Sequence, residues 1–83
     1  MAENYHYPLD LSWTATEMAI VIAFFNQVEA YYESKIDKNK FLSSYKEFKK
    51  IVPSISQEKQ LDREFEKVSG YSTYRALKGV QSK

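Results

Sequence analysis

Cysteine is absent from this chain, histidine occurs once, and glycine and proline occur only twice each. Without cysteine there are no disulfides and no thiolate metal ligands, which fits a reducing compartment. The one histidine, His6, lies near the N-terminus, so no serine has an evident partner base for nucleophilic catalysis. Gly70 and Gly79 cannot form a glycine-rich phosphate loop. These absences predict a non-enzymatic protein without a cofactor or a metal site.

Long apolar runs and a strong net charge are also missing. The longest apolar stretch, Met18 to Phe25, has eight residues, whereas a helix needs roughly 20 to cross a bilayer. No basic segment followed by an apolar run opens the sequence, so no signal peptide is expected. Twelve Lys and Arg against eleven Asp and Glu give a formal charge of +1, which provides no global attraction to nucleic acid or acidic membranes. We expect a cytoplasmic protein without membrane association.

Aromatic residues, in contrast, are abundant: seven Tyr, five Phe and one Trp among 83 residues. A chain of this length has room for one domain and one core. Each buried Phe or Tyr removes on the order of 150–250 Å² from water, so large side chains suit a small core. Packing is therefore the first explanation for most of them.

The start of the first helix is specified by two overlapping signals. Thr14 and Glu17 have the spacing of a capping box, in which each side chain binds the backbone amide of the other residue. Trp13 and Met18 have the spacing of a hydrophobic staple around the same cap. The pattern predicts a helix that begins after Thr14 and ends near Glu33.

Capping and breaking residues predict three further helices. Pro53 ends the second helix, because the residue before a proline is pushed out of the helical region. Gly70 supplies the left-handed residue that closes the third helix. The residues expected to cap the second, third and fourth helices are Asp37, Ser54 or Ser56, and Ser72.

Apolar side chains recur with helical spacing in all four segments, and no strand-like alternation is present. The fold class is therefore all-α: a compact array of three main helices plus a short C-terminal helix. We expect an extended N-terminal segment at residues 1–13, a single helical domain at 14–80 and a frayed tail at 81–83. The expected core residues are Ile20, Val21, Phe24, Val28, Tyr31 and Tyr32, flanked by Met18 and Phe25; Phe41, Leu42, Tyr45, Phe48 and Val52; Leu61, Phe65 and Val68; and Tyr74, Leu77 and Val80.

Glu29 and Glu33 lie four residues apart at the negative end of the first helix dipole, where two carboxylates are mutually unfavourable. A carboxylate-bundle metal site would need a Glu-x-x-His pair, which this chain lacks. A cation such as Lys35, Lys38 or Arg63 is the expected compensation.

Three tyrosines fall outside the predicted core faces: Tyr5, Tyr7 and Tyr71. Tyrosine offers a rigid surface with a polar tip, as partner-binding residues often do. We interpret these three as a candidate surface for an unknown protein partner, which makes the chain a small protein-binding module. A homodimer stays open, since a second copy could complete so small a core.

The alternative function is weak nucleic-acid binding through the second helix. Six lysines against two acidic residues between Lys35 and Lys50 give a local excess of +4. Lys46, Lys49 and Lys50 could contact phosphates. The segment has no arginine and its aromatic residues have core spacing, so a solvated lysine face is the favoured interpretation.

The order of several short motifs resembles a known family. They are Tyr7-Pro8-Leu9, Trp13-Thr14-Ala15-Thr16-Glu17, Val52-Pro53-Ser54 and Ser69-Gly70-Tyr71-Ser72. This pattern is similar to uncharacterised protein family 0223 of low-GC Gram-positive bacteria, over about Tyr5 to Leu77. The resemblance implies a compact helical cytoplasmic protein; it brings no established activity and transfers no functional residue.

Overall fold

Four helices account for most of the computed structural model, which describes residues 7–33 and 36–82. No strand occurs in those residues, so the all-α prediction is confirmed. Tyr5 of the predicted partner surface, and Lys35 near the first helix end, lie outside the described residues. The helices are α1 (Ala15–Glu33), α2 (Lys38–Ile51), α3 (Ile55–Ser69) and α4 (Thr73–Gln81).

The capping box at the start of α1 forms as its spacing predicts. The Thr14 amide donates to Glu17 Oε1 at 2.9 Å, and the Glu17 amide donates to Thr14 Oγ1 at 3.1 Å. Two amide donors that the helix cannot satisfy are thereby paired. The side chains that cap α2, α3 and α4 are those of Asp37, Ser54 and Ser72.

The helix ends also follow local chemistry. α2 stops at Ile51, two residues before Pro53. α3 closes on Gly70, whose φ of 81° lies in the left-handed region and whose amide donates to the Glu66 carbonyl. α4 extends to Gln81, one residue past the predicted domain boundary at Val80.

Phenylalanine rings from three helices form the centre of the core. Phe24 of α1 stacks on Phe48 of α2 at a centroid distance of 4.7 Å, and Phe25 stacks on Phe65 of α3 at 4.4 Å. Phe25, expected on the flank of the apolar face, is fully buried because α3 packs against it. The buried apolar side chains are Val21, Phe24, Phe25, Val28, Phe41, Phe48, Val52, Leu61, Phe65, Ala76 and Val80.

Three residues expected in the core are exposed instead. Tyr32 is 40% exposed, Val68 43% and Tyr74 61%. In α4 the buried face consists of Thr73, Ala76 and Val80, which is rotated away from Tyr74. Ala76 is small enough to let α4 approach the other helices closely, so the larger Tyr74 remains outside.

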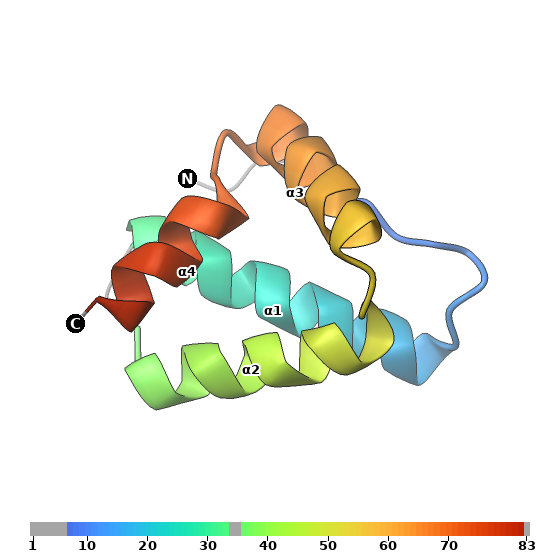
Figure 1. Ribbon diagram of the computed structural model, residues 1–83, viewed down its shortest axis with the longest axis horizontal. Coiled ribbons are helices and arrows are strands. Elements are labelled where there is room, and N and C mark those ends of the chain that lie inside the picture. Colours follow the sequence, from blue (N-terminus) through green and yellow to red (C-terminus); the bar gives the residue numbers. More distant parts are fainter. Residues whose placement is uncertain (1–6, 34–35, 83) are drawn as a thin grey trace.

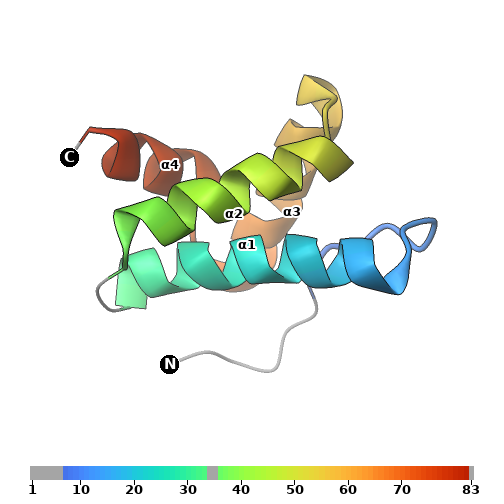
Figure 2. The same ribbon diagram turned by 90° about the horizontal axis from the view of Figure 1, so that it is seen from below.

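α2 lies alongside α1 over most of its length, and α3 and α4 lie together on one side of this pair (Figures 1 and 2). The first described residues of the N-terminal segment lie against α3. The Tyr7 ring lies against both Phe25 and Phe65, at centroid distances of 5.8 and 6.0 Å. This segment therefore packs on the helical core, with Leu9 and Trp13 also partly buried there. None of the helices in residues 7–33 and 36–82 is both long and apolar enough to span a bilayer.

Candidate functional site

Tyr7, a residue of the predicted partner surface, is half-buried and hydrogen-bonded within the fold. Its hydroxyl lies 3.0 Å from Glu29 Oε1, to which it donates, and 3.0 Å from Asn26 Oδ1. Burial, followed by the hydrogen bond to Glu29, raises the pKa of Tyr7 to about 12. The side chain thus connects the N-terminal segment to α1.

Tyr71, the second described residue of that surface, has a similar role at the end of α1. Its hydroxyl donates to Glu33 Oε2 at 2.6 Å, and this bond raises its pKa. Its ring stacks on Tyr32 at 4.8 Å, and the Tyr32 hydroxyl donates to the Ser72 carbonyl at 3.0 Å. Tyrosine hydroxyls therefore donate to both acidic residues whose proximity needed compensation, Glu29 and Glu33.

The three lysines of the alternative surface do not share one environment. Lys46 and Lys50 are exposed, and Lys50 pairs with Glu47 at 3.2 Å on the same helix. Lys49 instead points to α3, where its Nζ lies 2.6 Å from Glu58 Oε1. Both members of this pair are partly buried, with side chains 26% and 17% exposed.

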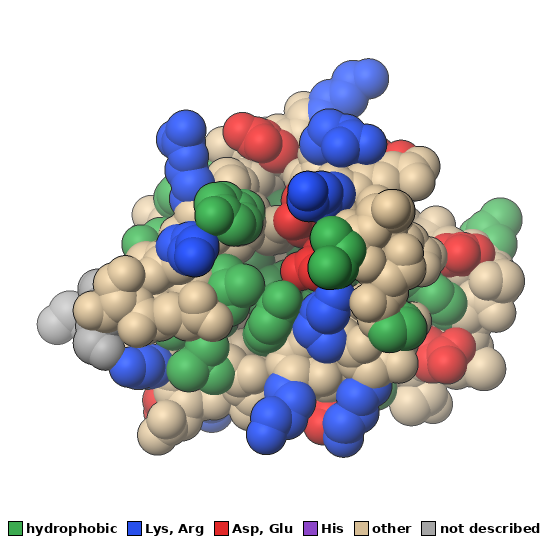
Figure 3. All heavy atoms as spheres, in the orientation of Figure 1, with side chains coloured by type: hydrophobic (Ala, Val, Ile, Leu, Met, Phe, Trp, Pro, Cys, Tyr) green, Lys and Arg blue, Asp and Glu red, His purple; other side chains and the backbone are tan. Residues whose placement is uncertain are grey.

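A groove between α2, α3 and α4 is the main surface feature that the sequence did not reveal. Its volume is about 390 Å³, and two prominent apolar residues line it: Ile55, 66% exposed, and Tyr74, 61% exposed. Figure 3 shows hydrophobic side chains gathered around this hollow, with basic and acidic side chains beside them. The lining residues are Tyr45, Lys49, Ile55, Glu58, Lys59, Asp62, Tyr74, Leu77, Lys78 and Gln81.

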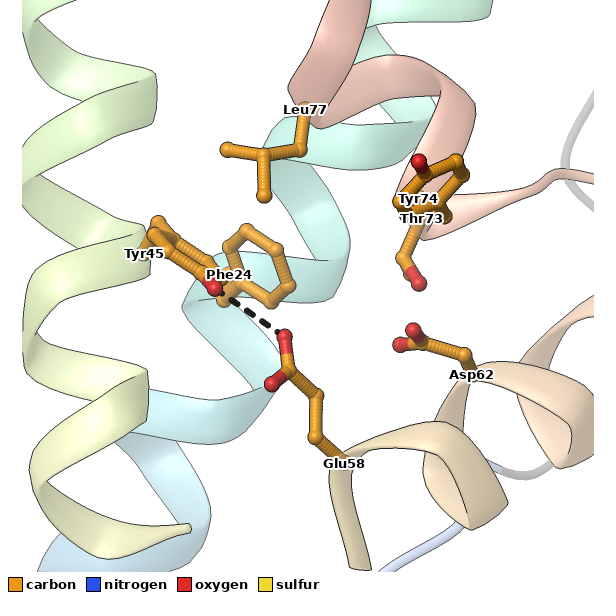
Figure 4. A pocket seen from close by; sticks show the side chains of 7 residues that line it. All are labelled: Phe24, Tyr45, Glu58, Asp62, Thr73, Tyr74 and Leu77. Carbon is orange, nitrogen blue, oxygen red and sulfur yellow. Dashed lines mark hydrogen bonds between the residues drawn. The ribbon is translucent and has the colours of Figure 1, made fainter. Parts of the chain in front are cut away.

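A small cavity of about 20 Å³ lies at the floor of the groove and shares Tyr45, Glu58, Asp62, Tyr74 and Leu77 with it. Thr73 and Phe24 complete its wall. The Thr73 hydroxyl points toward the Asp62 carboxylate (Figure 4). Thr73 is 2% exposed, so its hydroxyl is turned to this carboxylate and away from water. A cavity of this size holds about one water-sized group.

The electrostatics of the floor are dominated by two carboxylates one turn apart on α3. Glu58 accepts hydrogen bonds from the Tyr45 hydroxyl at 3.1 Å and from Lys49. Burial, followed by the charge of Glu58, raises the pKa of Tyr45 to about 12. Burial also raises the pKa of Asp62, although the Thr73 hydroxyl acts in the opposite direction. Asp62 is thus a half-buried carboxylate in an acidic neighbourhood.

The rim of the groove has a different character from its floor. Lys59 and Lys78 are exposed beside it, and Lys78 Nζ lies 5.6 Å from the centroid of the Tyr74 ring. Attraction between a cation and an aromatic face holds such a pair together. No group of three or more His, Asp or Glu side chains in the described part of the chain is arranged to hold a metal ion.

Four capped helices around a phenylalanine core define a small all-α domain. The chain belongs to the Uncharacterised protein family (UPF0223), whose family model matches residues 4–83. It is 66% identical over 82 residues to a UPF0223 protein of Lactococcus lactis subsp. cremoris strain MG1363, covering 99% of this chain and 88% of that protein. It is also 58% identical over 83 residues to a UPF0223 protein of Streptococcus pneumoniae strain CGSP14, covering 100% of this chain and 90% of the relative. The family resemblance seen in the sequence motifs is confirmed.

Proposed function

We propose that the protein is a small, non-enzymatic protein-binding module of the cytoplasm, and that the groove between α2, α3 and α4 receives its partner. The observation that supports this most directly is that Ile55 of α3 and Tyr74 of α4 are both exposed and line the same hollow. Large apolar side chains gathered around a concavity are typical of interaction sites, whereas isolated ones are ordinary on any surface.

The composition of the groove fits recognition of a protein segment. Tyrosine is enriched among residues that dominate binding energy, because it buries a large area at low entropic cost. Leu77, half-buried between Tyr45 and Tyr74 in the lining, adds an apolar floor. A side chain inserted from a partner would remove these surfaces from water together.

The groove is a different surface from the one predicted at Tyr7 and Tyr71. Both remain predicted partner residues, but their rings and hydroxyls already interact with α1 and its neighbours. A Tyr71→Ala variant would therefore disturb the packing at the end of α1 as well as any partner contact. Substitutions at the groove separate the two effects better, since Ile55 and Tyr74 are largely exposed.

Affinity capture with matched variants tests the proposed function. Ile55→Asp and Tyr74→Asp should each abolish capture of the partner, while Val68→Asp, at an exposed apolar position of α3 outside the groove lining, should preserve it. Circular dichroism and urea unfolding confirm that each variant is folded. If every variant still captures the partner, the proposal is wrong. If only Tyr71→Ala loses the partner, the partner binds at the tyrosines and not at the groove.

Nucleic-acid binding through α2 is the weaker alternative. Of the three lysines predicted for this surface, Lys46 and Lys50 face solvent, whereas Lys49 is paired with Glu58. A Lys46→Glu/Lys50→Glu variant should lose any affinity for single-stranded or duplex DNA, and wild-type binding should weaken steeply with salt. A flat fluorescence-anisotropy titration at low salt removes this alternative.

A further inference from the structure

The floor of the groove contains a buried hydroxyl and a half-buried carboxylate that face one another, those of Thr73 and Asp62. Thr73 Oγ1 is buried, and its hydroxyl points toward the Asp62 carboxylate. No Lys or Arg of residues 7–33 and 36–82 lies within ion-pair distance of Asp62. Buried charges in proteins are usually paired with an opposite charge, so the half-buried Asp62 carboxylate can accept a cationic donor in addition to the Thr73 hydroxyl.

The neighbouring Glu58 does not have the same need. It already accepts from the Lys49 ammonium and the Tyr45 hydroxyl. Asp62, one helical turn away and lining the same cavity, faces the Thr73 hydroxyl and is in no ion pair with a Lys or Arg of the described residues. Two carboxylates and a hydroxyl around one small space form a set of acceptors, which complements a cation that donates hydrogen bonds.

We propose that the groove recognises a lysine side chain of its protein partner, whose ammonium group enters the floor cavity and donates to Asp62 and Thr73. This inference rests on the proposed function and specifies the chemistry of the same site. The alkyl stem of the lysine lies along Leu77 and Tyr74 on its way to the floor. An aromatic wall of Phe24, Tyr45 and Tyr74 favours the cation further.

The size of the cavity selects lysine over arginine. Its volume of about 20 Å³ holds one water-sized group. An ammonium is a compact point charge with three donors, whereas a guanidinium is a wider planar fork. Asp62, Thr73 and Glu58 supply three acceptors for those three donors.

The rim determines what surrounds that lysine in the partner. Lys59 and Lys78 flank the entrance and would repel a uniformly basic segment. Ile55 and Tyr74 offer apolar contact on either side. The fitting segment is one lysine among apolar and acidic residues.

A titration followed by nitrogen–proton correlation spectra tests this with small probes on the intact chain. n-Butylammonium chloride represents the lysine side chain, n-butanol its uncharged counterpart, ethylguanidinium chloride the arginine side chain, and sodium chloride the ionic-strength control. Butylammonium should shift the backbone amides of Asp62, Thr73 and Tyr74 in a saturable manner. Asp62→Asn, which nearly preserves shape, should weaken that binding by about tenfold or more, because a charged hydrogen-bond acceptor is lost. Ethylguanidinium should bind more weakly than butylammonium.

Three results overturn the lysine inference: no shift with butylammonium, equal shifts with butanol, or shifts that Asp62→Asn leaves unchanged. Any of these would mean that the cavity does not recognise an ammonium group. The proposed function fails separately, through the Ile55→Asp and Tyr74→Asp captures. A partner that depends on Ile55 but binds Asp62→Asn equally well contradicts lysine recognition while preserving the protein-binding groove.

Discussion

The phenol of Tyr31 in α1 lies directly against Gly79 in α4, so closely that a Cβ atom at residue 79 would overlap the Tyr31 hydroxyl. Glycine inside a helix costs roughly 0.5–1 kcal/mol relative to alanine. The close approach of the two helices explains why that position in α4 has no side chain. α4 is thereby seated on α1, with Val80 buried beside this contact.

Gly79→Ala should therefore destabilise the protein, although alanine is the better helix former. Overpacking costs about 1–3 kcal/mol and exceeds the gain in helix propensity, so a net loss of about 1 kcal/mol is expected. Urea unfolding measures it. In a Tyr31→Leu background the same substitution should become neutral or stabilising. Stabilisation by Gly79→Ala in the otherwise unchanged protein would contradict the packing described above.

Phe65 and Val68, three residues apart on α3, should respond very differently to substitution. Phe65 is fully buried and stacked on Phe25, so Phe65→Ala should cost about 3–5 kcal/mol of unfolding free energy, enough to unfold much of a domain this small. Val68 is 43% exposed, and Val68→Thr should stay within about 0.5 kcal/mol of the wild type. Similar losses at both positions would show that α3 is rotated relative to this fold.

Alkaline pH should destabilise the fold through Tyr7 and Tyr45. Each has its pKa raised to about 12 from an ordinary value of 10.0. The unfolded chain therefore loses these protons first, and the unfolding free energy should fall as the pH rises from about 10 toward 12. A Tyr7→Phe/Tyr45→Phe variant should show a shallower fall, measured by urea unfolding at several pH values. Parallel curves for the two proteins would contradict the role of these hydroxyls.

The Asp62 carboxylate should destabilise the fold at neutral pH. Its pKa in the folded protein is raised above the ordinary value of 3.8, so its stabilising contribution is complete below that value and is lost as pH rises through the folded pKa. Asp62→Asn should accordingly unfold at higher urea than the wild type at neutral pH, and the difference should disappear toward pH 3.8. The groups around Asp62 are Tyr45 and Lys49 of α2, Glu58, Lys59 and Glu66 of α3, and Thr73, Tyr74 and Lys78 of α4.

A lower neutral-pH stability for Asp62→Asn would mean that Lys49 or Lys59 already satisfies the carboxylate in solution. Lys59→Met tests whether Asp62 pairs with Lys59. If no pair forms, this substitution should change the stability of neither the wild type nor the Asp62→Asn variant. The correlation spectra used for the probe titration verify that each variant keeps the native fold.

Local chemistry made the helix boundaries predictable. Thr14, Ser54 and Gly70 act through bonds to backbone groups three or four residues away, so the signal lies within one short window of sequence. Core faces were predictable where apolar residues were large, as at Phe24 and Phe48.

The groove was not predictable because three helices that meet only in space form it. In α4, Tyr74, Leu77 and Val80 share a helical phase, but burial follows Thr73, Ala76 and Val80, since small residues permit closer packing. Tyr7 has no helical periodicity around it, so the sequence predicts a surface position, whereas its ring packs against Phe25 and Phe65. Contacts between distant segments carry no local signature.

The packing of α4 on α1 also affects how this chain folds during its synthesis. Ala76 and Val80 are fully buried against α1 and its neighbours, yet they are among the last of the described residues to leave the ribosome. Until then the apolar side chains that α4 covers stay open to water on the nascent chain. Because domains generally fold as units, the cooperative transition must wait for residue 80 to emerge. Folding of this domain is therefore coupled to the synthesis of α4. On a ribosome paused before residue 76, the apolar side chains that α4 covers would remain exposed and accessible to chaperones.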